Sequence, residues 1–358
     1  MKTFLKISLV TIGFLVLLFV LFLAFFTISD YKPDAILDIH NTNHPDTLKG
    51  GDTLTIITWN IGYAGLGDEM DFFYDGGEKV RTTIENTQKN LSEISNFLTN
   101  TSKPDFILLQ EVDKKAKRTY LIDETKHLAG LFKGFIMFFA PNYKVRFVPL
   151  PVTSPMGFVH SGLLSLSDPN PSKSVRLDLP GEYSWPMKVF MLDRCILLNR
   201  YPLNNGKEFV LLNIHNSAFD DGSLKKQEMD FILNLVIKEY EKGNYIAAGG
   251  DWNQNPPGFT DNKFNKPDGY ENFLLTRIDD NFLPEQWQWC FGSNVPTNRS
   301  LRTAFNKKTS GTTVLDFFLL SPNIEIISVK TYDLAFQNSD HNPVRIKFVI
   351  KNIASQAK

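Results

Sequence analysis

The first apolar segment of the chain is much longer than any of the others. Residues 7–28 are almost unbroken apolar sequence, with Lys2 and Lys6 before the run and Asp30 after it. As a helix this run is about 33 Å long, which is enough to cross the hydrocarbon core of a bilayer. Bulky residues occupy its end, where signal peptidase cleavage requires small ones. The pattern therefore predicts an uncleaved transmembrane helix, with a cleaved signal peptide as the alternative.

The charges beside this run predict its orientation. Positive residues mark the cytoplasmic side of a membrane segment, so residues 1–6 are expected in the cytoplasm and the rest of the chain outside it. This places the protein in the plasma or inner membrane as a single-pass protein. Residues 29–50 contain Pro33 and Pro45 and show no sustained period, which predicts a tether. His40 and His44 within it are interpreted as solvated rather than as metal ligands.

Beyond residue 50, short apolar runs typical of strands alternate with helical stripes. Ile84, Leu91, Ile94 and Leu98 mark one helical face, and residues 224–239 predict a second helix. The predicted strands cover residues 54–59, 106–109, 135–140, 162–166, 195–199, 209–214, 245–249, 315–320 and 344–350. Because strands outnumber helices, we expect two packed sheets with helices outside them, in one domain over residues 51–352, followed by a tail over 353–358.

Residues 141–194 are rich in proline. This density predicts long ordered loops that shape a substrate rim, with a surface insertion of no catalytic consequence as the alternative.

Composition narrows the function classes. The chain has 358 residues, is 42% hydrophobic and 22% charged, and has a net charge of −1. These values exclude a mainly disordered chain and disfavour a strongly basic nucleic-acid binder. Cys195 and Cys290 are too few for a disulfide framework or a cysteine-rich metal site, and Cys195 is expected to be a buried thiol, with a bridge between the two as the alternative.

Polar residues follow several of the predicted strands directly. Strand ends converge into a cleft in layered α/β folds, although each such residue alone is more often a turn or cap residue. The set comprises Asn60, Glu111, Asn213, His215, Asp251, Asn253, Asp316, Asp340 and His341. Together they suit hydrolysis of a phosphoester, in which negative charge builds up on phosphate.

Each residue type has a place in that chemistry. Carboxylates such as Glu111 and Asp340 hold Mg²⁺, which neutralises phosphate oxygens, and Asp251 is suited to orienting a water. A histidine held by a carboxylate, as His341 with Asp316, presents a proton or a positive charge to the phosphoryl group. Neutral amides donate to phosphate without repelling it, which suits Asn60 and Asn253. Gly249 and Gly250 are expected to let a ligand approach the backbone closely.

With these residues the sequence resembles the endonuclease/exonuclease/phosphatase superfamily. This superfamily includes deoxyribonuclease I, abasic-site endonucleases, neutral sphingomyelinases and inositol polyphosphate phosphatases. The resemblance covers about residues 54–350. It rests on motifs that occur in the family's order: Thr58-Trp59-Asn60, Leu109-Gln110-Glu111-Val112, Asn213-Ile214-His215, Gly249-Gly250-Asp251-Trp252-Asn253, Leu315-Asp316-Phe317 and Ser339-Asp340-His341-Asn342-Pro343. The implied fold is a four-layered α/β sandwich, here preceded by one transmembrane helix.

The resemblance implies a role for each site residue. Glu111 is the expected principal Mg²⁺ ligand, with Asn60 and Asp340 beside it and Mn²⁺ as an alternative ion. Abasic-site enzymes carry an aspartate two residues after the asparagine, where this chain has Gly62, and this departure weakens an abasic-site interpretation.

The other implied roles concern phosphate and water. Asp251 is expected to position the nucleophilic water, and Asn253 to bind phosphate. His341, paired with Asp316, is expected to contact the scissile phosphate, and His215 to act as an acid or a phosphate donor.

The sequence therefore predicts a membrane-anchored, Mg²⁺-dependent phosphoester hydrolase that acts on a phosphodiester outside the cytoplasm. A phospholipid headgroup is favoured because the anchor places the site near lipid and the net charge does not favour DNA. A non-specific extracytoplasmic endonuclease and a catalytically silent binding module are the alternatives. We infer no protein partner and expect a monomer.

Overall fold

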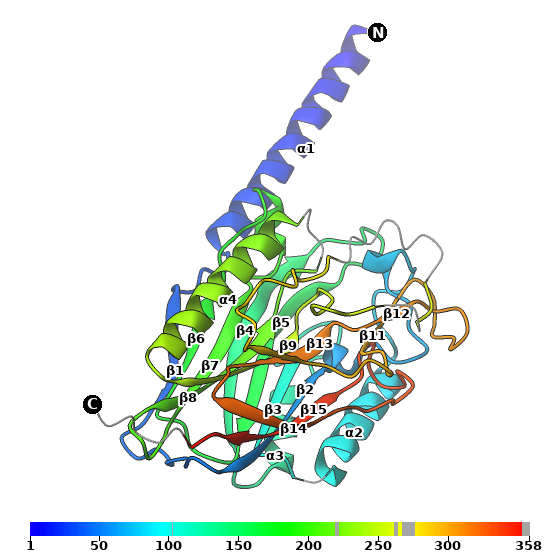
Figure 1. Cartoon of the computed structure of the whole chain (residues 1–358). Coiled ribbons are helices and arrows are strands. Elements are labelled where there is room, and N and C mark those ends of the chain that lie inside the picture. Colours follow the sequence, from blue (N-terminus) through cyan, green and yellow to red (C-terminus); the bar gives the residue numbers. More distant parts are fainter. Residues whose placement is uncertain (102, 219–221, 261–263, 267–275, 353–358) are drawn as a thin grey trace.

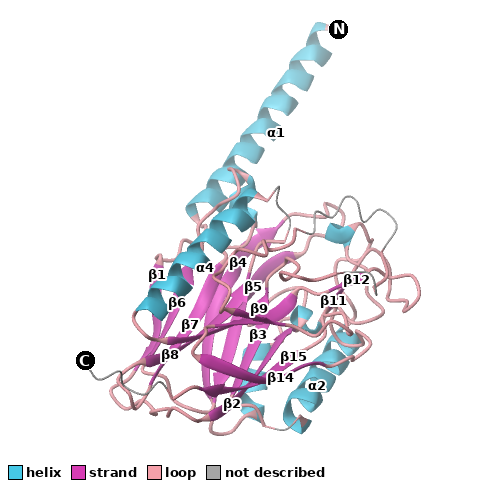
Figure 2. Ribbon diagram, in the orientation of Figure 1, coloured by secondary structure: helices cyan, strands magenta, loops and turns pink. Residues whose placement is uncertain are grey.

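Two sheets lie face to face in the centre of the molecule (Figures 1 and 2). The computed structural model describes residues 1–101, 103–218, 222–260, 264–266 and 276–352. The seven-stranded sheet has, in spatial order, β1 (Ile36–Asn41), β6 (Lys173–Asp178), β7 (Cys195–Pro202), β8 (Glu208–His215), β9 (Tyr245–Asp251), β13 (Asp316–Leu320) and β10 (Gln288–Cys290). The six-stranded sheet has β14 (Ile324–Thr331), β15 (Val344–Ile350), β2 (Thr53–Asn60), β3 (Phe106–Asp113), β5 (Gly157–Ser167) and β4 (Ile136–Val148). A short pair, β11 (Asn298–Arg299) and β12 (Thr312–Thr313), lies apart from both.

Helices cover the outer faces of the two sheets. Helix α4 (Ser223–Glu241) packs Ile232 and Val236 onto the seven-stranded sheet. Helices α2 (Ile84–Asn100) and α3 (Glu124–Leu131) pack Ile94 and Leu128 onto the six-stranded sheet. These layers confirm the predicted α/β sandwich of two packed mixed sheets with outer helices.

The inner faces of the sheets form the central core. In β15 the apolar residues Val344, Ile346, Phe348 and Ile350 are buried, while Lys347 between them is exposed, which is the alternation of a strand with one buried face. Burying each large apolar side chain stabilises the fold by about 1.5–3 kcal/mol. The alternation thus determines which face of β15 meets the other sheet.

The proline-rich segment is less loop-like than predicted. Strand β4 continues to Val148, β5 begins at Gly157, and β6 lies in the same segment, so the loops are confined to residues 149–156, 168–172 and 179–194. Pro141 is tolerated because β4 is an edge strand and its register shifts at this residue. Composition alone did not distinguish an edge strand with proline from a loop.

The N-terminal segments differ in part from their predicted form. Helix α1 (Lys2–Ile28) covers the predicted apolar run, begins five residues earlier, and projects from the domain (Figure 1). It is the one described helix long and apolar enough to cross a membrane. The segment predicted as a tether contains strand β1, which pairs with β6 and was missed by the sequence pattern. The predicted tail, residues 353–358, lies outside the described residues.

A buried carboxylate, Glu239, lies near the C-terminal end of α4. Glu239 is 3% exposed and accepts hydrogen bonds from Arg200, Lys242 and Asn244. Burial alone would raise its pKa, but these donors lower the pKa of Glu239 to about 2. A lowered carboxylate pKa contributes stability that is present above the ordinary value near 4.5 and is lost as pH falls towards 2. We therefore expect Glu239→Gln to lower the free energy of unfolding by about 3 kcal/mol at pH 7.

Urea unfolding at several pH values measures this effect. The deficit of Glu239→Gln should shrink between pH 4.5 and pH 2. Glu241→Gln, at the exposed end of the same helix, is the matched control and should change little. A deficit that does not depend on pH would show that packing, not the ionised carboxylate, is responsible.

Candidate active site

The predicted site residues lie together where the strand ends of both sheets meet. His215, Asp251 and Asp316 stand opposite one another in register across β8, β9 and β13. Asn60 ends β2 and Glu111 lies near the end of β3, on the other sheet. The sheets are tied at this point by Asn213, whose Oδ1 accepts from Gln110 (2.7 Å) and whose Nδ2 donates to the Leu109 carbonyl (3.1 Å). Asn213 therefore has a structural role, because its hydrogen bonds join the two sheets.

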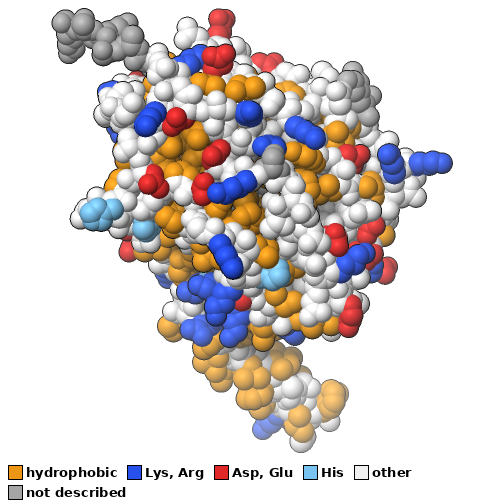
Figure 3. All heavy atoms as spheres, turned by 90° about the horizontal axis from the view of Figure 1, so that it is seen from below, with side chains coloured by type: hydrophobic (Ala, Val, Ile, Leu, Met, Phe, Trp, Pro, Cys, Tyr) orange, Lys and Arg blue, Asp and Glu red, His pale blue; other side chains and the backbone are white. Residues whose placement is uncertain are grey.

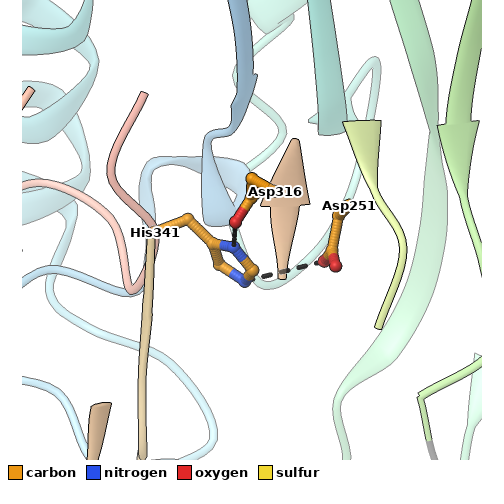
Figure 4. A group of neighbouring side chains, drawn as sticks. All are labelled: Asp251, Asp316 and His341. Carbon is orange, nitrogen blue, oxygen red and sulfur yellow. Dashed lines mark hydrogen bonds and ion pairs between the residues drawn. The ribbon is translucent and has the colours of Figure 1, made fainter. Parts of the chain in front are cut away.

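His341 and Asp316 form the predicted pair (Figure 4). His341 Nδ1 donates to Asp316 Oδ2 at 2.7 Å, and both side chains are buried. His341 Nε2 lies 3.7 Å from Asp251 Oδ2 and 3.0 Å from the Asn298 side-chain amide. Burial alone would lower the pKa of His341, but the carboxylates of Asp316, Asp251 and Asp340 raise it well above its ordinary value. The carboxylates around His341 thus favour the positively charged form of its imidazole.

His215 has the opposite protonation state. Its Nε2 lies 3.6 Å from Asp251 Oδ2 and 3.9 Å from Glu111 Oε1. Burial, with Arg194 and His341 nearby, lowers the pKa of His215 well below its ordinary value, so the ring is neutral near pH 7. A neutral imidazole retains one N–H donor for a phosphate or leaving-group oxygen. The two histidines thus offer different chemistry.

Asn60 connects the acidic residues. Its Nδ2 donates to Glu111 Oε1 (3.2 Å) and to Asp251 Oδ2 (3.0 Å), while its Oδ1 accepts from the Gly62 amide (3.0 Å). Oδ1 keeps a second lone pair for an ion. The arrangement orients both carboxylates toward one space.

The donor set fits a divalent cation. Glu111 has a φ of 53° in a bulge of β3, and its side chain is 26% exposed. Burial and then Asp340 raise the pKa of Glu111, while burial and Asp251 raise the pKa of Asp340, against His341 and Arg299. Carboxylates that disfavour one another's charge in this way are stabilised by a hard cation. Glu111 and Asp340 would hold the ion, with Asn60 beside them, and a bound ion supplies neutralisation of phosphate oxygens.

A second group of ligand atoms lies close by. Asp251, Asp316 and His341 present ligand atoms within 4.8 Å of one another. His341 Nδ1 is engaged with Asp316, however, so binding an ion there would break a short buried hydrogen bond. Asp316 is therefore better suited to orienting His341 than to binding a metal ion.

Asn253 follows Asp251 in a tight turn. Asp251 Oδ1 accepts from the Asn253 backbone amide (2.9 Å), and Asn253 Nδ2 donates to the Asn216 carbonyl (2.8 Å). One amide hydrogen of Asn253 is used in this way and the other is left for phosphate.

The packing of neighbouring strands requires both glycines before Asp251. A Cβ on Gly249 would lie within contact distance of Phe318 Cε1, and one on Gly250 would overlap the Ile214 carbonyl oxygen. The predicted close approach of a ligand at these glycines stays a prediction.

Gly62 has a left-handed backbone conformation and no space for a side chain. Its φ is 50°, and a Cβ there would lie 2.8 Å from Asp340 Oδ1 and 3.0 Å from Leu66 Cβ. The position thus has no room for the aspartate of abasic-site enzymes. We expect Gly62→Ala to lower the free energy of unfolding by about 1–2 kcal/mol and to weaken Mg²⁺ binding, because Asp340 must move.

The control for this substitution is Gly206→Ala. Gly206 has a φ of 77°, and nothing lies within 4 Å of its Cβ position. It should show the backbone cost alone, with the Mg²⁺-induced rise in Tm unchanged. Equal rises in Tm for both variants would contradict the contact with Asp340.

Sequence reasoning missed several residues around the site. Asn298 contacts His341, and Thr297 Oγ1 accepts from the Asp316 amide (2.9 Å). Asp75 is also nearby: burial, together with Asp340 and Glu111, raises its pKa to about 7. Asn298 begins the two-residue strand β11, and Asp75 ends the short 3₁₀ helix η2 (Phe73–Asp75), so neither is marked by a periodicity or by the end of a long apolar strand.

Comparisons with known proteins identify the family and the fold of the chain. The sequence matches the model of the Endonuclease/Exonuclease/phosphatase family over residues 57–341. No curated protein sequence matches the chain. The similar solved structures include an endonuclease/exonuclease/phosphatase from Beutenbergia cavernae (16% identity, TM-score 0.55, covering 84% of this chain and 72% of that one).

Two further structures are comparable in fold. A family protein from Bacteroides thetaiotaomicron has 13% identity and a TM-score of 0.52, covering 86% of this chain and 98% of that one. TDP2 from Caenorhabditis elegans has 13% identity and a TM-score of 0.50, covering 83% of this chain and 74% of that one. At these identities the likeness concerns the fold. With the family model matching most of the sequence, the chain belongs to the Endonuclease/Exonuclease/phosphatase family of metal-dependent phosphodiesterases, nucleases and phosphatases and is an enzyme of that class.

Proposed function

We propose that the protein is a membrane-anchored, Mg²⁺-dependent phosphodiesterase that hydrolyses phospholipid headgroups outside the cytoplasm. The observation that carries this proposal is α1, an apolar helix of 27 residues that continues from the catalytic domain and leaves nearly all its side chains exposed. In water such a surface is unfavourable, whereas in a bilayer it is solvated by lipid.

The arrangement of residues supports attack by water on a phosphodiester. Asp251, held by Asn60 and by the Asn253 amide, orients the water and accepts its proton. His341 places positive charge beside the phosphoryl oxygens as the ester bond breaks. His215 donates an N–H to phosphate or to the departing oxygen.

Substrate preference follows from location and charge. A net charge of −1 gives no general attraction to a polyanionic nucleic acid. Lipid substrates need no such attraction, because the anchor keeps the enzyme at the surface where they are concentrated.

Turnover by the full chain in nanodiscs tests the proposal. Sphingomyelin and phosphatidylinositol lipids are presented in the disc, and DNA, RNA and inositol phosphates in solution, with Mg²⁺ or with EDTA. We expect Mg²⁺-dependent release of a headgroup product. Cleavage of DNA or RNA alone would show that the substrate is a nucleic acid and not a lipid.

Orientation is tested separately in intact cells or spheroplasts. Added protease should digest the catalytic domain while cytoplasmic marker proteins survive. Full protection of the domain would refute its extracytoplasmic location.

A further inference from the structure

The end of α1 is fixed to two surface segments of the catalytic domain. Phe26 is 8% exposed, and its ring lies 5.5 Å from the Phe190 ring and 6.2 Å from the Phe147 ring. Trp185 Nε1 donates to Thr27 Oγ1 at 3.1 Å. Phe147 lies near the end of β4, and Phe190 ends the short helix η3 (Met187–Phe190). The helix therefore leaves the domain between the β4–β5 turn and the loop that precedes η3.

The same two segments expose large apolar side chains. Val152 is 82% exposed and Leu150 is 42% exposed in the β4–β5 turn, while Trp185 is 56% and Met187 is 51% exposed beside η3. Beyond residues 1–28, Val152 is the most exposed large hydrophobic residue of the described chain. We call these four residues the apolar rim. Such a group beside the base of a membrane helix is the arrangement expected of a surface that meets lipid.

An apolar crevice joins this rim to the helix. It has a volume of about 390 Å³ and lies between Trp185 and one face of α1. Its other lining residues are Val20, Leu23, Ala24, Thr27 and Ile28. A lipid acyl chain has the chemistry to fill a crevice of this lining.

Basic side chains lie behind the apolar rim. Lys144 and Arg146 are exposed on β4, and Lys144 Nζ lies 4.6 Å from the centre of the Tyr31 ring, just after α1. Lys188, beside Met187, pairs with Glu182 at 2.8 Å. In the view of Figure 3, Lys and Arg side chains gather at the edge of the domain next to α1. Tyrosine and basic residues are typical of protein surfaces at the headgroup region of a bilayer, so their position beside the end of α1 fits contact with that region.

We propose that the apolar rim inserts into the surface of the bilayer that α1 crosses, so that the catalytic domain lies against the membrane in one orientation. The inference rests on the anchor of the proposed function and deepens it, because it favours a substrate held in the membrane surface. A path of contacts runs from η3, which carries Met187 of the rim, towards the site. Tyr143 Oη donates to the Phe190 carbonyl (3.3 Å), and its ring lies 5.9 Å from the guanidinium of Arg118, which pairs with Asp113 beside the site.

Cysteine labelling tests the docking. The native Cys195 and Cys290 are buried, so the NBD fluorophore can be attached to introduced cysteines. Val152→Cys and Met187→Cys report on the rim, and Ile327→Cys, 51% exposed on the edge strand β14, is the matched control. Phe14→Cys, in the middle of α1, reports on the anchor. The full-length variants are placed in nanodiscs of phosphatidylcholine and phosphatidylglycerol, with nitroxide lipids labelled at a shallow or a deep position.

The expected pattern distinguishes docking from anchoring. Labels at 152 and 187 should lose emission with the shallow nitroxide, the label at 14 with the deep nitroxide, and the label at 327 with neither. Quenching at 14 without quenching at 152 and 187 would overturn the docking and leave the anchor intact. Absence of quenching at 14 would refute the anchor itself. Each substituted rim residue is exposed, so folding of the variants is not at risk.

Discussion

Replacing His341 by alanine is expected to lower kcat by at least about 100-fold, because it removes the buried positive charge that faces the phosphoryl group. His341 is 5% exposed and lies between Asp316 and Asp251, at 2.7 Å and 3.7 Å. Asp316→Asn should cost less by itself, since the ring stays in place with weaker orientation. Turnover of bis(p-nitrophenyl) phosphate, a soluble phosphodiester, measures both variants without dependence on the natural substrate.

The double variant determines whether the two residues act as a unit. If Asp316 acts by orienting and charging His341, Asp316→Asn should change kcat little on a His341→Ala background. If Asp316 only stabilises the turn, its loss should lower Tm and leave kcat of the folded protein unchanged. Fully additive losses in kcat, or near-normal turnover by His341→Ala, would contradict the assigned roles.

The fold was predictable where one face of an element is buried. Leu91, Ile94 and Leu98 are spaced for a helix and form part of the buried face of α2, whereas Ile84, the first residue of α2, is 38% exposed. Strand β14 was missed because it lies at a sheet edge, where exposed residues such as Ile327 leave no clear alternation. Strand β1, at the other sheet's edge, was missed for a similar reason.

The site was predictable as a set of strand ends, and only in part as a set of contacts. Asn60, Glu111 and Asp251 follow apolar strands, and the structure joins them by hydrogen bonds. Asn298 and Asp75 reach the site from a two-residue strand and a short 3₁₀ helix whose positions depend on tertiary packing, so sequence spacing did not indicate them. The apolar rim was hidden for the same reason, because its two loops come together only at the base of α1.

Replacing Glu111 by glutamine is expected to reduce Mg²⁺-dependent turnover by orders of magnitude while the fold survives. The substitution keeps the shape and removes one charge from a cluster in which Asp340 disfavours the ionised form of Glu111 and Asp251 disfavours that of Asp340. A ligand charge lost from such a site weakens binding of a hard cation. The same loss of repulsion should make the metal-free protein at least as stable as the unsubstituted enzyme near pH 7.

Thermal unfolding with EDTA and with Mg²⁺ separates these effects from damage to the fold. The unsubstituted protein should gain Tm on addition of Mg²⁺, and Glu111→Gln should lose that gain without a lower Tm in EDTA. Glu124→Gln is the control, since Glu124 is a buried glutamate whose carboxylate accepts the Asp113 backbone amide at 2.7 Å. It should keep the Mg²⁺-induced gain. A Glu111→Gln enzyme with unchanged turnover and an unchanged Mg²⁺-induced gain would show that Glu111 is not a ligand, and the ion would then have to bind around Asp251 and His341, where it competes with the hydrogen bond to Asp316.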